Sequence, residues 1–384
     1  MAKSKFSFSK IILLIPNIAA VILLIMAYLA DYFNPKAYFF VALCGCLYPY
    51  ILILNLLFVI LWIFRLNKWF LLSLICILIG FSSMKRLYQF SGKKKPAETE
   101  NLVKVMSYNV QVMGLYSHFQ ANSGKIAYEQ RDSILDLLEG EQPAILCLQE
   151  YYCDNNPKTP FPTTALIKKK LKEPNACFHL PFKRGSHRYG LAVFTKYPVV
   201  NQENIDFEGG TTNLAMYADL KIGKDTVRVF NVHFQSLHLK KEDYIFAQQY
   251  AGNQSEQNKE DAISEGSKRI LRKLKKGFAV RAEQVKKLNG YIQSSPYKTL
   301  VCGDFNDTPW SFTYKKIQNL LKDAHAESGK GFGNTMKFNN WLSFRIDYIF
   351  CDNTFKSYQF TTLPYRASDH LPVCVYIDTQ QDRK

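Results

Sequence analysis

The sequence predicts an all-α transmembrane region followed by an α/β domain in which two sheets pack face to face between flanking helices. Two observations support this fold class. Apolar residues are concentrated in three runs before residue 91, and beyond residue 101 many short strand patterns are separated by few helical ones. We therefore expect a transmembrane region at residues 1–90, a polar linker at 91–101 and a second domain at 102–384.

The three apolar runs, at about 11–30, 38–64 and 69–84, predict about three membrane spans. The first run has 20 residues without a charge, which is enough to cross a bilayer. A signal peptide is the alternative, but its apolar stretch would be shorter, and here a second run follows at once. The third run, with 16 residues, is short for a span. We expect a multi-pass membrane protein.

Basic residues near the spans bear on orientation. An N-terminus in the cytoplasm places five of these residues inside and six outside, so the count alone decides nothing. Because the first helix usually dominates, we expect a cytoplasmic N-terminus. With three spans, the second domain then lies outside the cytoplasm.

The overall charge favours negatively charged partners. The chain has a formal net charge of +17, and 11 basic residues face only 3 acidic ones before Asn101. Such a balance suits phosphate-bearing molecules or an anionic membrane surface, but it selects no substrate. The nine cysteines have no metal-like spacing, so the sequence indicates no zinc site.

The second domain shows mostly strand patterns. They occupy residues 102–110, 144–148, 191–194, 215–220, 226–232, 300–302, 346–350 and 373–377. Helical spacing marks residues 128–138, and the stretch 240–289 predicts a long helix with a polar insertion around 251–265. Many strands with few helices are typical of a sheet-on-sheet core.

Polar residues end or interrupt six of these strands. A single one would be an ordinary cap or exposed end, but six such interruptions are hard to explain by capping. In the stretch 299–309, Gly303 lets the backbone turn, and the period of two puts Asp304 and Asn306 on one side. The other positions are Asn109, Glu150, Asn231 with His233, Asp347, and Asp369 with His370.

Three motifs carry a resemblance: LQE at 148–150, GDFND at 303–307 and SDHLP at 368–372. In this order the sequence resembles the endonuclease/exonuclease/phosphatase superfamily of metal-dependent phosphodiesterases and phosphatases. YGLAVFTKYP, FNVHFQS and RIDYIF strengthen the resemblance, which covers roughly residues 103–378. It implies a deoxyribonuclease-like, four-layer α/β/β/α sandwich with the active site at one edge, between the sheets.

The chemistry of these residues agrees with the roles that the resemblance implies. Mg²⁺, or Mn²⁺, would bind Glu150 first, with Asn109 and Asp369 nearby. Asp304 would orient or deprotonate the attacking water, and Asn306 would donate to a phosphoryl oxygen.

The two histidines would act on the phosphate. His370 would contact it while Asp347 holds the other ring nitrogen and favours the imidazolium. His233 would stabilise the same charge or protonate the leaving group.

The remaining candidates bind substrate. They are Asn231, Tyr189 and Arg188, and for the last two a purely structural role is the alternative. Gln111 stands where some family members carry an acidic residue, which puts a second metal ligand there in doubt.

We expect a membrane-anchored hydrolase of phosphate esters, resembling phosphodiesterases and endonucleases. A nucleic-acid substrate suits the basic balance, whereas membrane tethering favours a lipid or inositol phosphate phosphatase, or a sphingomyelinase-like enzyme. The basic cluster at 268–276 could be a helical face meeting phospholipid headgroups or solvent. A non-enzymatic membrane sensor with a regulatory soluble domain is the other class, but the spans carry almost no charge that would mark an ion pathway. The sequence does not indicate the oligomeric state.

Overall fold

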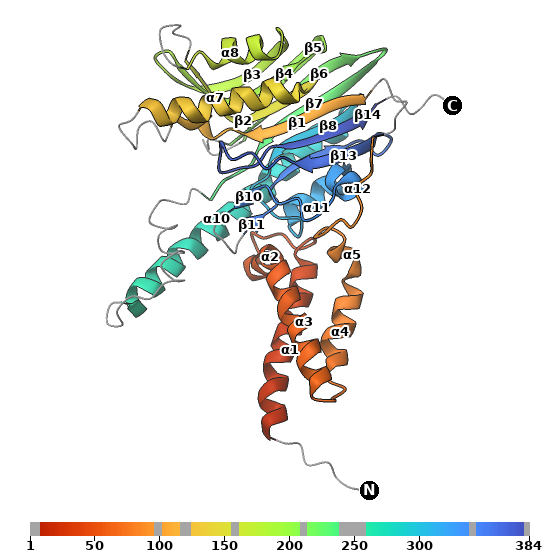
Figure 1. Ribbon diagram of the computed structural model, residues 1–384. Coiled ribbons are helices and arrows are strands. Elements are labelled where there is room, and N and C mark those ends of the chain that lie inside the picture. Colours follow the sequence, from red (N-terminus) through yellow and green to blue (C-terminus); the bar gives the residue numbers. More distant parts are fainter. Residues whose placement is uncertain are drawn as a thin grey trace.

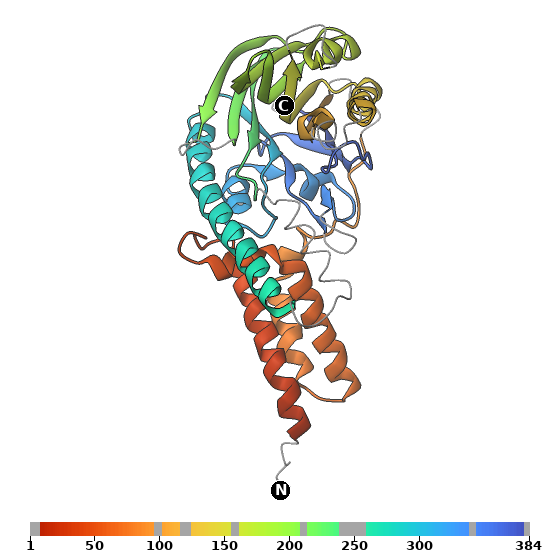
Figure 2. The same cartoon turned by 90° about the vertical axis from the view of Figure 1, so that its left-hand side faces the viewer.

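The computed structural model describes residues 8–95, 102–115, 124–154, 161–207, 213–237, 259–337 and 343–379. Over these ranges, a helical bundle extends from one end of a two-sheet domain (Figures 1 and 2). The chain's N-terminus lies at the far end of the bundle from the sheets (Figure 2). Part of the predicted linker, residues 96–101, and residues 238–258 lie outside the described ranges.

The first sheet has six strands in the order β13-β14-β1-β2-β4-β3. β1 runs parallel to β2 and antiparallel to β14. The bounds are β1 Leu102–Asn109, β2 Ile145–Asp154, β3 Asn175–Arg184, β4 His187–Thr195, β13 Lys356–Thr362 and β14 Val373–Asp378.

The second sheet also has six strands, in the order β5-β6-β7-β8-β12-β9. β7 and β8 are parallel, and β12 is antiparallel to β8. The bounds are β5 Val199–Asp206, β6 Leu214–Ile222, β7 Asp225–His233, β8 Lys298–Asp304, β9 Lys322–Asp323 and β12 Asp347–Cys351. A two-stranded ribbon of β10 Met336–Lys337 and β11 Ser343–Phe344 lies beside it.

Alternation along the strands creates the layers. Val103 and Val105 of β1 pack against Leu300 of β8 in the core between the sheets, whereas Met106 and Tyr108 point to the other face of the first sheet. That outer face packs on α7 Gly124–Glu141 and α8 Thr163–Lys170. The outer face of the second sheet packs on α10 Lys259–Gln293 and α11 Phe312–Gln318. The predicted α/β sandwich with helices on both sides is confirmed, and short helices η1 Gln111–Gly114 and α12 Ala324–Ser328 complete it.

Each predicted strand is present, but β3, β5, β13 and the two-residue strands β9, β10 and β11 were not predicted. β5 is exposed along most of its length, so it lacks the apolar alternation that marks a half-buried strand. The polar insertion predicted around 251–265 is wrong from Lys259 onward, because α10 starts there and continues without interruption to Gln293. Residues 251–258 lie outside the described ranges.

The bundle consists of α1 Phe8–Leu29, α2 Phe39–Cys46, α3 Tyr48–Phe64, α4 Phe70–Ile79 and α5 Phe81–Met84. Among the described residues, one helix, Lys10–Leu29, is long and apolar enough to cross a membrane. α2 and α3 pass the same test together but are bent by 73°. Pro49, in the first turn of α3, lacks the amide that would continue α2.

The expectation of a third uninterrupted span at 69–84 is not met. α4 has only 10 residues and ends at Gly80, after which α5 forms a single turn. At Gly80 a Cβ would lie 2.0 Å from the Tyr28 ring, and Tyr28 donates a hydrogen bond to the Cys76 carbonyl at 3.2 Å. The close approach of Tyr28 therefore requires a glycine at the position where α4 ends.

A buried polar network joins the three main helices of the bundle. Asn17 of α1 donates to Ser73 of α4 at 2.6 Å and accepts from Trp62 of α3 at 2.9 Å. Ser73 in turn donates to Asn55 at 2.9 Å, and the Asn55 amide donates to the carbonyl of Ala20. Every member has a partner, so the network fixes how the helices face one another.

The bundle meets the two-sheet domain at a buried junction. Arg86, just after α5, forms an ion pair with Asp31 at 2.7 Å and donates to the Pro309 carbonyl at 2.6 Å. Trp310 stacks on Tyr48 with ring centroids 4.4 Å apart and donates to the Ser83 carbonyl at 3.1 Å. Pro309 and Trp310 lie only five and six residues after Asp304, so the junction adjoins the polar end of β8.

Candidate active site

The ends of strands from both sheets meet at one edge of the sandwich. In the second sheet, His233 ends β7 and pairs in register with Asp304 at the end of the parallel strand β8. Asp347 begins the antiparallel strand β12 and stands opposite Asp304 on the other side. Asn109 of β1 reaches across from the first sheet, because its amide donates to Asp304 Oδ2 at 3.0 Å.

Gly303 permits the close approach of β7 and β8 just before Asp304. Its φ is +147°, and a Cβ would lie 1.9 Å from the carbonyl oxygen of Val232. Two residues later, Asn306 adopts a left-handed conformation with φ of 51°. Its backbone N–H donates to Asp304 Oδ1 at 2.8 Å, and its side-chain amide donates to the Phe234 carbonyl at 3.1 Å. The turn therefore fixes Oδ1 of Asp304 and leaves Oδ2 for the other residues of the site.

Asp304 Oδ2 is the centre of the cluster. His233 Nε2 lies 3.6 Å from it and His370 Nε2 lies 3.7 Å from it, in addition to the amide of Asn109. Burial raises the pKa of the Asp304 carboxyl above its usual value, and the negative charge of Asp347 adds to the rise, although both histidines oppose it. Asp304 is thus a stronger base than an exposed aspartate.

His370 and Asp347 form a dyad. His370 Nδ1 donates to Asp347 Oδ2 at 2.9 Å. The backbone amides of Ile346 and Asp347 both donate to Thr335 Oγ1 at 3.1 Å, which fixes the start of β12. Burial alone would lower the pKa of His370, but the carboxylates of Asp347 and Asp304 raise it well above its usual value, so the imidazolium predominates at neutral pH.

Glu150 comes from a bulge in β2, where the pairing with β4 shifts between Leu148 and Tyr151. Its φ is 49°, and Oε1 lies 3.9 Å from His233 Nε2. Burial and the nearby carboxylates of Asp369 and Asp304 raise the pKa of Glu150 to about 7. Asp369 is exposed at the rim of the site.

This site fits a divalent cation. Asp304, Asp347 and His370 offer ligand atoms that all lie within 4.8 Å of one another. Asp347 Oδ1 is buried without a hydrogen-bond partner among the described residues. Crowded carboxylates and an unpartnered oxygen are what a hard, oxygen-binding cation such as Mg²⁺ would satisfy.

The structure brings together most of the predicted site residues but leaves three of them elsewhere. Asn231 is fully buried between the sheets; its amide donates to the carbonyls of Leu148 and Ala192, and its oxygen accepts from Gln149 at 2.7 Å. Arg188 donates to the carbonyls of Gly185 and His187 in its own hairpin. Tyr189 packs against the ring of Phe182. Their described contacts support structural roles.

Two supporting residues were missed by the sequence reasoning. Thr335 holds the start of β12, and no sequence pattern marks it because its partners lie 11 and 12 residues away. Ser368 donates to the Asn109 carbonyl at 2.8 Å and accepts from the His370 backbone at 3.2 Å. Its place in the SDH motif was a signal that could have found it.

Two protein-family profiles match parts of the chain. A sequence profile described as "Endonuclease/Exonuclease/phosphatase family" matches residues 106–370. A second profile, a domain of unknown function (DUF8431), matches residues 9–87. No curated protein matches the chain.

Two solved structures are similar to this chain. TDP2 from D. rerio, humanized by 14 mutations, is 14% identical with a TM-score of 0.50, and the alignment covers 73% of this chain and 100% of that chain. The human Nocturnin catalytic domain is 18% identical with a TM-score of 0.49, covering 77% of this chain and 98% of that one. At 14% identity, the likeness to TDP2 shows the fold alone.

Proposed function

The chain belongs to the endonuclease/exonuclease/phosphatase family of phosphoric ester hydrolases, and from that premise we propose that it is a membrane-anchored, Mg²⁺-dependent phosphodiesterase. The observation that carries the proposal is the convergence of Asn109, His233 and His370 on one oxygen of Asp304. A buried carboxylate beside two histidines can take a proton from water next to groups that stabilise a developing negative charge.

Each residue has a role in hydrolysis. Asp304 accepts the proton of the attacking water, and its pKa, raised by burial, makes it a better base for that step. His370, held protonated by Asp347, donates to a phosphoryl oxygen as negative charge develops. His233 stabilises the same charge or protonates the leaving oxygen, and Asn306 donates to the phosphate.

Glu150 is the first metal ligand in this proposal, with Asn109 and Asp369 beside it. Mg²⁺ or Mn²⁺, when bound, neutralises charge on the phosphate. The alternative set, Asp304 with Asp347 and His370, already uses one contact internally, because His370 Nδ1 bonds to Asp347 Oδ2. Glu150 has no such competing partner of opposite charge closer than His233 at 3.9 Å among the described contacts.

Exposed apolar side chains on the bundle support membrane insertion. Ile15 of α1 is 63% exposed, Ile53 of α3 53% and Ile79 of α4 75%. Exposed apolar side chains on three adjacent helices form a larger apolar surface than soluble proteins usually expose. In this proposal the bundle crosses the membrane three times, and α4 with α5 makes the third pass although it is interrupted at Gly80. The N-terminus is in the cytoplasm, and the catalytic domain is then outside, because the two lie at opposite ends of the bundle (Figure 2).

A lipid phosphate ester is the second candidate substrate beside nucleic acid, and α10 favours it. The helix runs from the second sheet toward the bundle, where Phe278 contacts Phe39 with ring centroids 6.1 Å apart (Figures 1 and 2). Its first half exposes Lys268, Arg272, Lys275 and Lys276. Basic residues beside membrane helices suit anionic headgroups.

The test uses the full chain in detergent micelles with Mg²⁺. Plasmid DNA, an abasic duplex, sphingomyelin and phosphoinositides are assayed side by side, and we expect hydrolysis that chelation by EDTA abolishes. Asp304→Asn and His370→Asn should each lower the rate by roughly 10²–10⁴-fold. Asp225→Asn and His187→Asn, at exposed positions, are the matched controls.

The outcomes separate the candidates. Hydrolysis of DNA alone would remove the lipid candidate, and hydrolysis of lipid alone would remove the nuclease. Full activity of both Asp304→Asn and His370→Asn would overturn the proposed site.

A further inference from the structure

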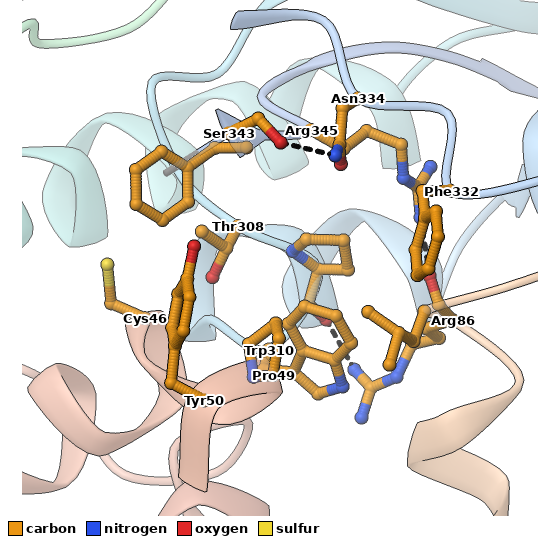
Figure 3. Close-up of a pocket in the computed structure, with 13 residues that line it drawn as sticks. Cys46, Pro49, Tyr50, Arg86, Thr308, Trp310, Phe332, Asn334, Ser343 and Arg345 are labelled. Carbon is orange, nitrogen blue, oxygen red and sulfur yellow. Dashed lines mark hydrogen bonds between the residues drawn. The ribbon is translucent and has the colours of Figure 1, made fainter. Parts of the chain in front are cut away.

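A cavity of about 320 Å³ lies between the bundle and the catalytic domain (Figure 3). Its lining comes from the junction of α2 and α3, from Arg86 and Leu87 after α5, from the segment 308–310, and from Phe332, Asn334 and residues 343–345. The carboxylates and histidines of the candidate active site do not line it. It is therefore a separate space, on the other side of the segment that follows Asn306.

The walls of the cavity are largely aromatic. Tyr50, Trp310 and Phe332 present their rings around the space (Figure 3), and Phe344 and two prolines also line it. Trp310 is held in place by Tyr48 and by its bond to the Ser83 carbonyl. Rigid rings of this kind suit an apolar chain.

Two buried polar groups lining the cavity lack partners. Thr308 is 4% exposed and Arg345 is 3% exposed, yet Thr308 Oγ1 and Arg345 Nε have no hydrogen-bond partner among the residues that the structure describes. The other Arg345 nitrogens are engaged, since one donates to Asp323 at 2.6 Å and one to the Arg86 carbonyl at 3.4 Å. Buried donors left in this way call for an acceptor oxygen from a ligand.

The guanidinium groups at the cavity do not call for an anion. Arg86 is neutralised by Asp31 at 2.7 Å and Arg345 by Asp323 at 2.6 Å. The ligand that fits is therefore uncharged where it meets Arg345 and Thr308, with acceptor oxygens next to apolar chain.

The position of the cavity identifies a source for such a ligand. It lies where the bundle helices meet the catalytic domain, which is the level of the membrane interface in the proposed insertion (Figures 1 and 3). Phe90 and Phe332, 88% and 52% exposed, both contact Tyr88 at this level. Exposed aromatic rings at the end of a membrane helix are typical of the interface, where the ester groups of phospholipids lie.

We propose that this cavity binds one membrane phospholipid as a non-substrate ligand. Its ester carbonyl oxygens accept from Arg345 Nε and Thr308 Oγ1, and the start of an acyl chain packs on Tyr50, Trp310 and Phe332. The proposal rests on the membrane anchoring proposed above, but not on hydrolysis. Because Thr308 follows the turn at Asn306 by two residues, the bound lipid also holds that turn in place.

The experiment measures lipid binding by the full chain carrying Asp304→Asn, so that hydrolysis plays no part. The protein is delipidated in detergent and titrated with dioleoylphosphatidylcholine or with its ether-linked analogue, which lacks the carbonyl oxygens. Native mass spectrometry and thermal unfolding report binding. We expect one ester lipid to bind and to raise the unfolding temperature, and the ether lipid to bind about tenfold more weakly.

Two substitutions locate the binding. Thr308→Val keeps the shape but removes the hydroxyl, and it should weaken the ester lipid while leaving the ether lipid unchanged. Cys46→Trp fills the cavity and should abolish binding, whereas Ile53→Trp, on the exposed face of α3, should not.

The opposite pattern overturns the proposal. If both lipids bind equally, or if Thr308→Val stabilises the protein without changing lipid affinity, the ester oxygens do not bond to Arg345 and Thr308, and the proposal is wrong. Binding that survives Cys46→Trp assigns the lipid to the outer surface of the bundle. None of these outcomes depends on catalysis, so the proposed activity stands or fails separately.

Discussion

At the scale of single residues, the two carboxylates of the cluster divide the work. Asp347 commits Oδ2 to His370 Nδ1, whereas Asp304 Oδ2 faces the Nε2 atoms of both histidines. An aspartate that only orients a histidine tolerates replacement by an acceptor better than one that must take a proton. The two positions should therefore respond differently to mutation.

Asp347→Asn should lower kcat by about 10–10³-fold and leave KM nearly unchanged, because it weakens the charge that holds His370 protonated but not substrate binding. Steady-state kinetics on whichever phosphate ester is hydrolysed measure the split. Asp225→Asn, at an exposed position away from the cluster, provides the comparison, and an equal loss there would contradict the dyad.

His325 gives a prediction for acid stability. It is buried, and burial together with the positive charge of Arg345 lowers its pKa to about 3. Between pH 6.5 and 3, His325 is protonated in the unfolded chain but neutral in the folded chain. The free energy of unfolding therefore falls as the pH falls through this window. The loss is about 1.4 kcal/mol per pH unit.

Urea unfolding of the full chain in detergent, at pH 6.5 and at pH 4.5, measures this loss. His325→Gln cannot titrate, so the variant should lose less stability than the parent over the same interval, by about 2–3 kcal/mol. Parallel pH dependence in the two proteins would show that His325 accepts a proton when folded.

At the scale of elements, Asn231 joins the two sheets. It stands on β7, but its partners are Leu148 and Gln149 of β2 and Ala192 of β4. The amide thereby ties the second sheet to the first directly behind the strand ends that carry His233 and Glu150.

Replacing Asn231 by Ala should cost about 2–4 kcal/mol, because it removes one hydrogen-bond donor from each of two buried carbonyls and the acceptor at 2.7 Å from the Gln149 amide. Chemical denaturation measures the loss. Asn201→Ala, on the exposed strand β5, is the control. If instead KM rises while stability is unchanged, Asn231 binds substrate as the sequence suggested.

The elements also show what the sequence could predict. Residues at strand ends, such as Asp304 and His370, were predictable because apolar runs locate the strands and their interruptions stand out. Asn231 has the same sequence signature, but its side chain is fully hydrogen-bonded to strands of the first sheet. The sequence does not show that these strands lie against β7. The break in the third predicted span was also missed: α4 ends at Gly80, where the Tyr28 ring leaves no room for a side chain, and that contact is made only after folding.

At the scale of the whole molecule, the bundle is part of the catalytic domain's support. Arg86 bonds to the carbonyl of Pro309, which follows the active-site turn, and its charge is balanced by Asp31. A bundle that only tethered the domain would need no such buried contact.

The ion pair at the junction can be tested by a double-mutant cycle. Asp31→Leu leaves the Arg86 charge buried and uncompensated, and it should cost about 3–5 kcal/mol. The double variant with Arg86→Met removes both charges and should be milder than the sum of the two single changes. Thermal unfolding in detergent gives the three values, and strict additivity would mean that the pair does not interact.

The contact between Arg86 and Pro309 also imposes an order on biosynthesis. The two residues are 223 positions apart, so the bundle with its Asp31–Arg86 pair is synthesised, and in the proposed insertion enters the membrane, before the ribosome makes the segment that docks on it. The segment at Pro309 therefore docks on a surface of the bundle that has already been synthesised. In the proposed insertion, a chain whose bundle has not folded in the membrane lacks the Arg86 contact that supports the segment after the active-site turn.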